Sequence, residues 1–413
     1  MEMNETATRV TRALLVSVDT GEYDAEGSLS ELFELTESAG AFPVASISQK
    51  LSHIEGATCV GSGKLEEIRA YCEQEEIDLL IFDLELSPIQ IRNIEDATGV
   101  RVIDRTMLIL DIFALRAKSR EGKLQVELAQ LRYMMPRLTG KGVEMSRLGG
   151  GIGTRGPGET KLETDRRHIK RRMETLKAEL REVEQRRLLH RKRREKDGVI
   201  TVAIVGYTNA GKSTLLNCLT DAGVLSEDKL FATLDPTSRA LKLPGGVSVM
   251  LIDTVGLVRR LPHHLVEAFK STLEEAAQAD IILNVCDVSN DEARLHLEVT
   301  ADLLSSLGAE DKPVIPVLNK CDIAADQSFP VSGAVRISAK TGEGIDRLLS
   351  AIEENLPKKL KRVRLLLPFE KAGLVSDIRK NAVLHSEEYT EDGIKAEATV
   401  DERMYHKLRD YIL

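Results

Sequence analysis

Paired cysteines and long apolar runs are both missing from this sequence. Its five cysteines form no CxxC pair and leave an odd one over, which argues against a zinc site and against a disulfide framework. No uninterrupted apolar run approaches the roughly 20 residues that a membrane-spanning helix needs. The first residues are acidic and polar and lack the charged-then-apolar pattern of a signal peptide. We therefore expect a soluble, cytoplasmic protein in a reducing compartment and, since nothing in the sequence demands an oligomer, a monomer.

The 413 residues are enough for two to four domains, and the first hundred alternate between β-rich runs and helical patterns. Strand–helix alternation implies crossover connections and a mostly parallel sheet. We predict an N-terminal parallel α/β domain over residues 1–104. Its expected strands are Ala13–Val18, Phe42–Ser48, Leu79–Phe82 and Val100–Ile103, and its expected helices lie near Ser30–Ser38, Lys64–Glu75 and Pro88–Thr98.

Two long helical stretches follow, at about Arg105–Arg137 and Thr164–Lys196. Their apolar residues step by four and three, a rhythm that gives each helix one narrow apolar seam. The seam residues are Leu124, Leu128, Leu131, Met135 and Leu138 in the first helix, and Ile169, Met173, Leu176, Leu180 and Val183 in the second. We predict a long antiparallel helical hairpin over residues 105–197. Gly122 falls inside the first helix, where we expect it to weaken the helix.

The segment between the two helices, Arg147–Glu159, holds six glycines and a proline. Such a composition fits neither a helix nor an ordinary strand. At the other end of the chain, beyond Pro357, a basic linker leads into a short tail. We predict that this tail is a small α+β domain over residues 358–413. Its expected elements are a strand at Val363–Leu367, a helix at Gly373–Asn381, strands at Val383–Tyr389 and Ile394–Val400, and a helix at Asp401–Tyr411.

A phosphate-binding loop begins where the apolar run Ile200–Val205 ends. The loop residues are Gly206, Tyr207, Thr208, Asn209, Ala210, Gly211, Lys212 and Ser213, and a helical pattern starts at Thr214. The glycines let backbone N–H groups wrap the phosphates while a helix N-terminus points at them. We expect Lys212 to reach the β and γ phosphates and the Ser213 hydroxyl to bind Mg²⁺. The alternative is a chance glycine-rich turn, which all four fixed positions and the strand–loop–helix context disfavour.

Three further motifs follow in order along the chain. They are Leu251-Ile252-Asp253-Thr254-Val255-Gly256, Asn319-Lys320-Cys321-Asp322 and Ser338-Ala339-Lys340. We expect Asp253 to hold Mg²⁺ through water and Gly256 to bring a backbone N–H to the γ-phosphate. The two carboxylate oxygens of Asp322 can accept hydrogen bonds from guanine N1–H and its 2-amino group, which selects GTP over ATP. A backbone N–H of the last motif can contact guanine O6. The ordered set predicts a P-loop GTPase domain over residues 198–357.

Two features bear on the rate of hydrolysis. The segment from Phe231 to Thr237 lies between the phosphate loop and Asp253, and a threonine there can close over the γ-phosphate and ligate Mg²⁺. We choose Thr233, because the segment is similar to the first switch of translation-factor-class GTPases, and we keep Thr237 as the alternative. Phe231 is expected near the nucleotide. Leu257 stands where Ras-like enzymes have a water-orienting glutamine, so intrinsic hydrolysis should be slow until a partner completes the site.

The sequence allows two interpretations of the role of Asn209. It matches a position that in some such GTPases helps to hold a K⁺ ion, whose charge acts where an arginine finger otherwise does. In the other reading, Asn209 only caps or braces the loop. The sequence therefore predicts a GTP hydrolase with GTP or GDP as ligand and Mg²⁺ bound through Ser213, Thr233 and Asp253. A K⁺ ion at Asn209 is one of the two interpretations of that residue. The catalytic groups of the hydrolase would be Lys212, Thr233 and Gly256.

The run from Gly150 to Arg166, GGIGTRGPGETKLETDR, resembles the signature of HflX-type GTPases. The run from Asp253 to Lys270, which forms the second switch and the helix after it, resembles the same family. The resemblance implies binding to the large ribosomal subunit, with the hairpin loop approaching ribosomal RNA near the peptidyl-transferase region. It also implies a role in splitting ribosomes or rescuing stalled ones under stress.

The residues themselves favour contact with RNA. Residues 166–196 carry 14 Lys and Arg against 5 Asp and Glu, inside a chain whose net charge is −9. Such a face is typical of phosphate-backbone binding, although a solvated helix face is the simpler alternative. The adjoining glycine-rich segment, with Arg147 and Arg155, favours RNA. A second function remains open, in which the protein is a nucleotide-regulated RNA-binding or RNA-remodelling protein that does not act through ribosome dissociation.

Overall fold

The computed structural model describes residues 10–139, 157–196, 198–220, 230–231, 237–260, 265, 273–324, 330–357, 361–400 and 402–413. The chain forms two compact units. The first, here called the N-terminal unit, contains residues 1–182, 228–234 and 259–269. The second, the GTPase unit, contains residues 183–227, 235–258 and 270–413. Within the described ranges, no helix is both long enough and apolar enough to cross a membrane.

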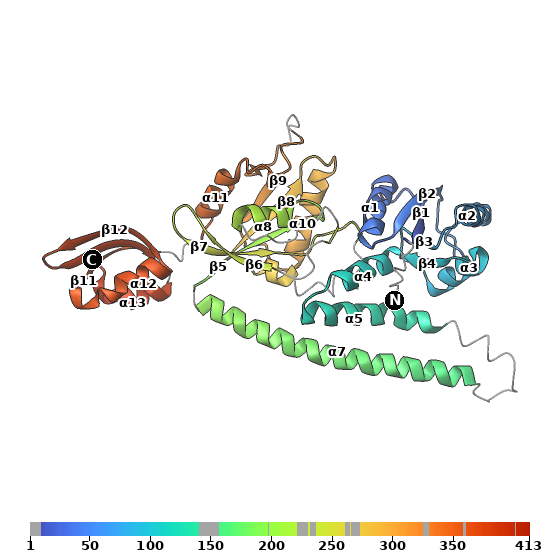
Figure 1. The fold of residues 1–413 in the computed structure, drawn as a ribbon, viewed down its shortest axis with the longest axis horizontal. Helices are drawn as coiled ribbons and strands as arrows, with labels where there is room; N and C mark the ends of the chain where they lie inside the picture. Colours follow the sequence, from blue (N-terminus) through green and yellow to red (C-terminus); the bar gives the residue numbers. More distant parts are fainter. Residues whose placement is uncertain are drawn as a thin grey trace, which may run out of the picture. The chain divides into compact units, whose positions relative to one another are not determined.

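A four-stranded parallel sheet forms the core of the N-terminal unit (Figure 1). Its strands, in the order β2-β1-β3-β4, are β2 (Phe42–Lys50), β1 (Arg12–Asp19), β3 (Leu79–Phe82) and β4 (Arg101–Asp104). The helices between them are α1 (Ala25–Ser38), α2 (Ser62–Gln74) and α3 (Pro88–Thr98). Ile68 of α2 and Ile94 of α3 pack on Leu14 and Leu80 of the sheet. The predicted parallel α/β fold is confirmed.

The prediction of one long helix at about Arg105–Arg137 is wrong, because the structure has two helices there. The first, α4 (Arg105–Arg116), ends where Ala117 adopts an extended backbone, and the second, α5 (Arg120–Met134), begins after Ser119. The Gly122 backbone N–H donates to Ser119 Oγ at 2.9 Å, so Ser119 is the N-cap. Gly122 therefore lies in the first turn of a helix rather than inside a longer one, where its low helix propensity costs less. A 3₁₀ turn, η1 (Met135–Thr139), ends this stretch.

The second long helix, α7 (Pro157–Lys196), begins earlier than predicted. Proline is favoured in the first turn of a helix, because the N–H that it lacks would have no partner there. The apolar seam forms between α5 and α7 as predicted. Its buried members are Leu124, Leu128, Met173, Leu176 and Leu180, and Leu131, Met135 and Ile169 pack at its edges. Beside the seam, the Arg172 guanidinium makes two hydrogen bonds of 2.7 Å to the Glu127 carboxylate.

The seam gives a direct test of what holds the hairpin closed. Leu176 is fully buried and Leu189, on the same helix, is 67% exposed. We expect Leu176→Ala to lower the free energy of unfolding by about 2–5 kcal/mol, the usual cost of truncating a buried leucine. Leu189→Ala removes the same atoms and should change it by less than about 0.5 kcal/mol. Urea unfolding followed by the helical circular dichroism signal measures both, and equal effects would contradict the seam.

The GTPase unit is built on a six-stranded mixed sheet in the order β10-β9-β8-β5-β7-β6. Only β6 runs antiparallel to its neighbour, so the carboxyl ends of β5, β7, β8 and β9 meet at one edge. The strands are β5 (Ile200–Gly206), β6 (Thr237–Lys242), β7 (Ser248–Asp253), β8 (Ile281–Asp287), β9 (Val314–Asn319) and β10 (Val335–Arg336). The helices around it include α8 (Lys212–Thr220), α10 (Ala293–Ser306) and α11 (Ile345–Glu354).

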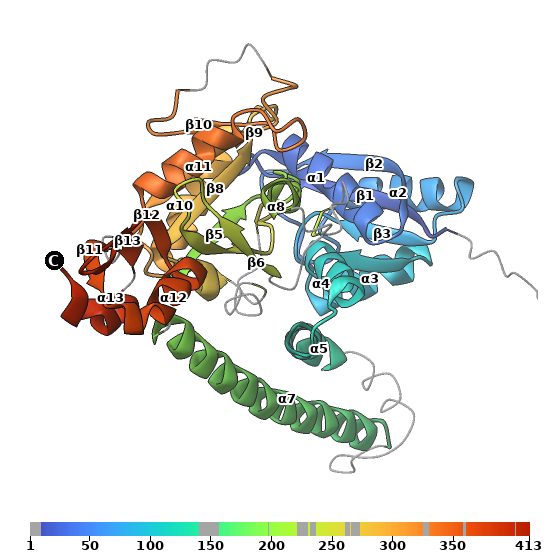
Figure 2. The same cartoon turned by 60° about the vertical axis from the view of Figure 1, so that its left-hand side comes forward.

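The tail forms a small antiparallel sheet in the order β11-β13-β12, with two helices on one face (Figure 2). Its elements are β11 (Lys361–Leu367), η2 (Phe369–Lys371), α12 (Gly373–Asn381), β12 (Val383–Thr390), β13 (Gly393–Val400), α13 (Glu402–Leu408) and η3 (Arg409–Tyr411). Ile378 of α12 and Leu408 of α13 pack on Leu365 and Ala398 of the sheet. The predicted α+β tail is confirmed, although its last helix ends at Leu408 and continues as a 3₁₀ turn.

Candidate nucleotide-binding site

The phosphate loop connects β5 to α8, and its two glycines have no room for a side chain. Gly206 has φ +148°, and a Cβ there would collide with the Val285 carbonyl oxygen of the neighbouring strand. Gly211 has φ +87°, and a Cβ there would collide with Asn319 Nδ2. Only glycine tolerates both the backbone angles and the close approach. The loop therefore exposes backbone N–H groups at the start of α8, where phosphates bind.

Lys212, the first residue of α8, lies in the middle of this loop. Its ammonium donates to the Tyr207 carbonyl oxygen at 2.6 Å, so the loop backbone curls around the lysine side chain. Burial lowers the pKa of the Lys212 ammonium to about 8, and the nearby Asp253 carboxylate acts in the opposite direction. This position matches the predicted role, because a buried cation among backbone N–H groups attracts phosphate oxygens. Thr214 follows in the first turn of α8.

Two side chains whose oxygen atoms can coordinate a magnesium ion lie close to Lys212. The Ser213 hydroxyl donates to Asp253 Oδ2 at 2.9 Å, although the two residues come from α8 and from the end of β7. Asp253 is fully buried, and the next residue, Thr254, is anchored by a 2.8 Å hydrogen bond to the Ile204 carbonyl oxygen. A hydroxyl and a carboxylate are hard ligands, so the pair fits Mg²⁺. Thr233, the third predicted ligand, lies outside the described residues.

The segment after Asp253 is joined to the phosphate loop by backbone hydrogen bonds. The Thr208 N–H donates to the Leu257 carbonyl oxygen at 2.7 Å, and the Leu257 N–H donates to the Gly206 carbonyl oxygen at 3.1 Å. A Cβ on Gly256 would lie 2.7 Å from Thr208 Cγ2 and 3.0 Å from Lys212 Nζ. Gly256 is therefore held against Lys212, the lysine expected to reach the phosphates. The sequence predicted its nearness to the γ-phosphate but not this pairing, which has no local signature.

The Asn319 side chain braces the site from the end of β9. Its Nδ2 donates to the Ala210 carbonyl oxygen at 2.8 Å, and its Oδ1 accepts from the Ala339 N–H at 2.9 Å. One buried amide thus ties the phosphate loop to the predicted guanine-contacting loop. Lys320, which follows at φ +63°, places its ammonium 2.8 Å from Asp287 Oδ2. Sequence reasoning missed Asp287, although its place at the carboxyl end of the adjacent strand could have indicated it.

The residues predicted to contact the guanine base lie after the carboxyl ends of β9 and β10, at the same edge of the sheet. Asp322 and Lys340 are exposed, whereas Ser338 and Ala339 are buried. Ser338 Oγ accepts from the Thr341 N–H at 3.2 Å and so holds the turn that follows β10. The structure therefore brings the Asp322 carboxylate to an open position next to a rigid loop. Such a position lets the carboxylate meet a ligand without first breaking an internal contact.

Two predicted nucleotide contacts are placed differently. Phe231 belongs to the N-terminal unit, where its ring is buried and packs edge-on against Phe113 of α4, with 4.6 Å between ring centroids. We therefore correct its assignment: a large apolar ring gains more from this packing than from an open loop over the nucleotide. Tyr207 keeps its backbone in the phosphate loop, but its ring stacks on His296 of α10 at 3.8 Å. Asn209 is exposed with φ +59°, a left-handed conformation that asparagine tolerates.

Asp322 provides a test of nucleotide choice that is separate from folding. We expect Asp322→Asn to weaken GTP binding by roughly 10⁴-fold and to improve xanthosine triphosphate binding, because an amide offers one acceptor and one donor where guanine needs two acceptors. Asn319→Ala is the contrast, since it leaves the Ala210 carbonyl and the Ala339 N–H without that amide. It should lower thermal stability as well as affinity for both nucleotides. Equal GTP affinity in Asp322→Asn and the unsubstituted protein would disprove the assignment.

Comparison with known proteins covers almost the whole chain. Residues 26–114 match the family "GTP-binding GTPase N-terminal", 116–194 "GTP-binding GTPase Middle Region", 201–320 "50S ribosome-binding GTPase" and 326–408 "HflX C-terminal domain". The chain is 53% identical over 405 residues to GTPase HflX of Lacrimispora saccharolytica, which covers 97% of this chain and 96% of that protein. It is 42% identical over 374 residues to GTPase HflX of Escherichia coli, which covers 88% and 87%. A solved GTP-binding protein of Sulfolobus solfataricus, in complex with GDP, is 26% identical with a TM-score of 0.46, covering 84% of this chain and 98% of that one.

Proposed function

The chain belongs to the HflX family of GTPases, and from this premise we propose that it uses GTP binding and hydrolysis to split ribosomes or rescue stalled ones under stress. It is a GTP hydrolase, and its GTPase domain matches the 50S ribosome-binding GTPase family. In this proposal the large ribosomal subunit is the partner and the protein acts in the cytoplasm, where ribosomes work. GTP binding favours docking, and hydrolysis releases the protein from the subunit.

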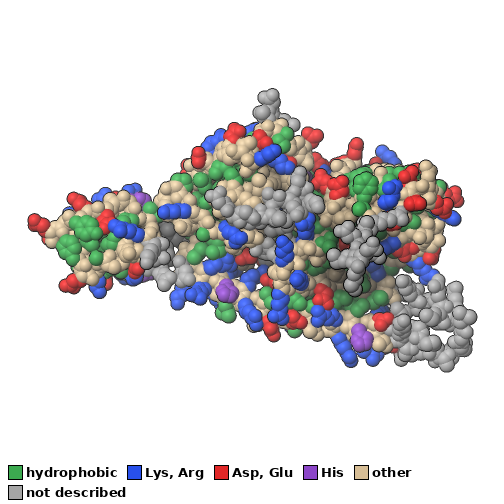
Figure 3. Space-filling view, in the orientation of Figure 1, with side chains coloured by type: hydrophobic (Ala, Val, Ile, Leu, Met, Phe, Trp, Pro, Cys, Tyr) green, Lys and Arg blue, Asp and Glu red, His purple; other side chains and the backbone are tan. Residues whose placement is uncertain are grey.

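The basic surface of α7 is the observation that carries the proposal. Nearly all of its Lys and Arg side chains are exposed or half-exposed, and Figure 3 shows them spread along the helix. Past Leu180, where the seam with α5 ends, even Leu188 and Leu189 are exposed. A helix that is polar on every side gains little from the core, so its charge points to a binding role. Phosphate backbones of RNA are the partners that such a surface fits.

The nucleotide site supports a switch that its partner completes. Lys212 and the backbone of the phosphate loop would bind the β and γ phosphates, while Ser213 and Asp253, with Thr233, would hold Mg²⁺. A bound Mg²⁺ would neutralise charge that develops between these phosphates. The Leu257 backbone is fixed on the phosphate loop, and its apolar side chain has no group that could orient water. Catalysis therefore needs a group or a rearrangement from elsewhere, and the large subunit is the candidate to supply it.

Potassium is a proposed cofactor at Asn209. Its exposed amide on a left-handed turn of the phosphate loop can offer an oxygen to a cation. We expect GTP hydrolysis to be faster in KCl than in NaCl at equal ionic strength, because K⁺ fits the larger oxygen cage and adds positive charge near the leaving phosphate. Asn209→Ala should remove the difference. Equal rates in both salts would leave Asn209 as a brace of the loop.

The subunit-binding proposal is tested by GTP hydrolysis with and without purified large ribosomal subunits. We expect strong stimulation, and we expect Arg181→Gln with Lys192→Gln, two exposed positions on one face of α7, to weaken it. Losing two phosphate contacts should reduce the slope of log affinity against log salt by about 2. Arg69→Gln with Arg294→Gln removes the same charge from exposed positions on other helices and should change neither quantity.

The same experiment separates the second function. Deleting residues 149–158 should spare intrinsic hydrolysis but lose stimulation by the subunit. If GTP binds tightly while the subunit gives no stimulation, and free RNA binds as well as the subunit, then a nucleotide-regulated RNA-binding protein is the better description.

A further inference from the structure

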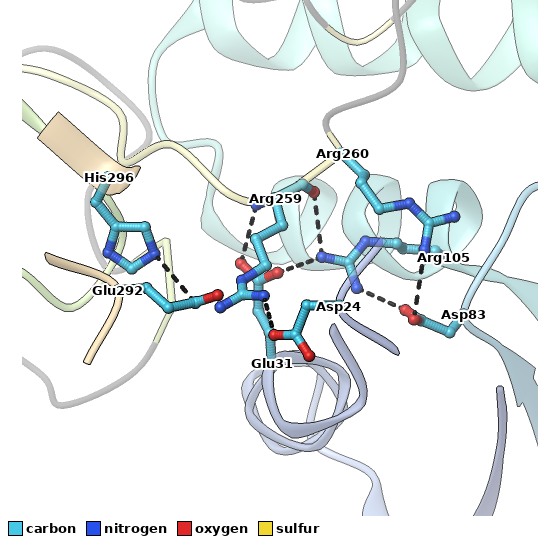
Figure 4. Close-up of polar contacts among 8 residues, drawn as sticks. All are labelled: Asp24, Glu31, Asp83, Arg105, Arg259, Arg260, Glu292 and His296. Carbon is cyan, nitrogen blue, oxygen red and sulfur yellow. Dashed lines mark hydrogen bonds and ion pairs between the residues drawn. The ribbon is translucent and has the colours of Figure 1, made fainter. Parts of the chain in front are cut away.

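Both switch segments of the nucleotide site supply residues to the N-terminal unit. Leu230 and Phe231, which follow the phosphate loop in sequence, belong to it, and so do Arg259 and Arg260, which come directly after the Asp253–Gly256 motif. Figure 4 shows the polar contacts that Arg259 and Arg260 make. The chain thus leaves the GTPase unit three residues after Gly256 and enters a different set of contacts.

Arg259 is bound through its side chain and through its backbone. Its guanidinium donates to Asp24 Oδ2 at 2.9 Å, and its backbone N–H donates to Glu31 Oε1 at 3.2 Å (Figure 4). Its carbonyl oxygen accepts from the Arg105 guanidinium at 3.2 Å. The hydrogen bond from Gly27 and the Arg259 guanidinium hold the pKa of Asp24 below its usual range. Three groups on one residue are therefore fixed by α1 and α4.

Arg260 is held by the loop after β1 and by the end of β3. Its guanidinium lies 3.6 Å from Asp83 Oδ2 and 3.8 Å from the centre of the Tyr23 ring, a cation–π contact. Its backbone has φ +50°, a conformation that an arginine adopts only when its surroundings favour it. Asp83 follows β3 directly, and Tyr23 follows β1, so both belong to the carboxyl edge of the sheet.

Arg105 joins the two sides of this cluster. Its guanidinium donates to Asp83 Oδ1 at 2.7 Å and to Glu31 Oε2, and its side chain is 3% exposed. We call the six residues Asp24, Glu31, Asp83, Arg105, Arg259 and Arg260 the arginine clasp. It contains three carboxylates and three guanidinium groups, of which Arg105 and Asp83 are deeply buried and Asp24 is half exposed. A buried ion pair is costly to break from one side, because the remaining charge keeps its desolvation penalty.

The clasp occupies the place where α/β domains of this kind bind ligands. In the strand order β2-β1-β3-β4, the connections leave β1 in one direction and β3 in the other. The crevice between the carboxyl ends of β1 and β3 is the usual ligand position. Here Asp83, at the carboxyl end of β3, lies against the guanidinium groups of Arg105 and Arg260. This end of the sheet is therefore occupied by arginines of the chain itself.

The residue before Arg105 connects the clasp to the hairpin. Asp104 Oδ2 accepts from the Arg137 guanidinium at 3.2 Å and from the Leu86 N–H at 3.1 Å, while Oδ1 caps α4. Arg137 lies in η1, at the end of α5, and its guanidinium stacks 3.4 Å above the Tyr133 ring. At the β4–α4 junction, the Arg105 side chain therefore contacts the switch segment, and the side chain of the adjacent Asp104 contacts Arg137 at the end of α5.

We propose that the clasp is a guanidinium site for the chain's own switch arginines, and that Asp104 and Arg105 couple this switch segment to the end of α5. Arg105 and Arg259 are proposed as positioning residues, because their contacts are with Asp24, Glu31, Asp83 and one another. In this proposal the nucleotide moves the segment after Gly256, and the ion pairs of the clasp pass that movement to Arg137 as a shift of the β4–α4 junction. Coupling of this kind is reciprocal, so a ligand on the hairpin would alter nucleotide affinity. The inference rests on the proposed function only in taking that ligand to be the large subunit.

The test uses the full chain without ribosomes. Hydrogen–deuterium exchange is measured for residues 130–139, at the end of α5, with GDP and with the non-hydrolysable GTP analogue GMPPNP. We expect exchange rates to differ by roughly fivefold, the lower end of allosteric effects. Arg259→Gln should abolish the difference while GDP still binds, and Arg259→Lys, which keeps the charge facing Asp24, should restore part of it. Arg294→Gln, an exposed arginine of α10, is the control and should leave the difference unchanged.

A second measurement separates coupling from loss of structure. The ratio of GMPPNP to GDP affinity is compared for Arg137→Gln, Arg259→Gln and the double variant. Arg137 contacts Leu86, Tyr133 and Asp104, and we expect Arg137→Gln to change the ratio, and to have no effect once Arg259→Gln is present. Equal exchange at residues 130–139 with both nucleotides, or additive effects in the double variant, would overturn the proposal. Failure of large subunits to stimulate hydrolysis would instead count against the proposed function, and would leave the exchange result standing.

Discussion

Close approach of neighbouring segments to the backbone of three glycines is the constraint on which the nucleotide site depends. Side chains at Gly206, Gly211 and Gly256 would collide with Val285, Asn319 and Thr208 respectively. Those partners come from β8, β9 and the loop itself, so the site reaches its geometry only when the mixed sheet has formed in register. The Asn319 amide then fixes the distance between the phosphate-binding and base-reading loops. Binding and folding of the GTPase unit thus draw on the same contacts.

Local signals predicted the elements that carry them. Helix α3 matches its predicted bounds, because Ser87 and Gln90 form a capping box, Pro88 starts the helix and Gly99 ends it in the left-handed conformation. The hairpin seam followed from periodicity alone. The break between α4 and α5 was missed because apolar periodicity runs on past Ser119, and a single serine gives a cap only in context. Motif order likewise predicted the nucleotide loops, since each motif directly follows a strand.

Contacts between distant segments could not be predicted in the same way. Asp287, the last residue of β8, was missed because its pairing with Lys320 depends on which strands are neighbours. Phe231 was misplaced because its burial partner, Phe113, comes from an unrelated helix. The ion pairs of Arg259 and Arg260 were not predicted either, since their carboxylate partners are more than 170 residues away in sequence. A single sequence holds no local trace of such pairs.

The helix α7 contributes to both units, with residues up to Glu182 in the N-terminal unit and residues from Val183 in the GTPase unit. A flexible linker at this boundary would not transmit a force along the chain. A continuous helix resists bending and twisting, because every turn is tied to the next by backbone hydrogen bonds. Helix α7 therefore crosses the boundary as one continuous element, and β5 begins four residues beyond its end.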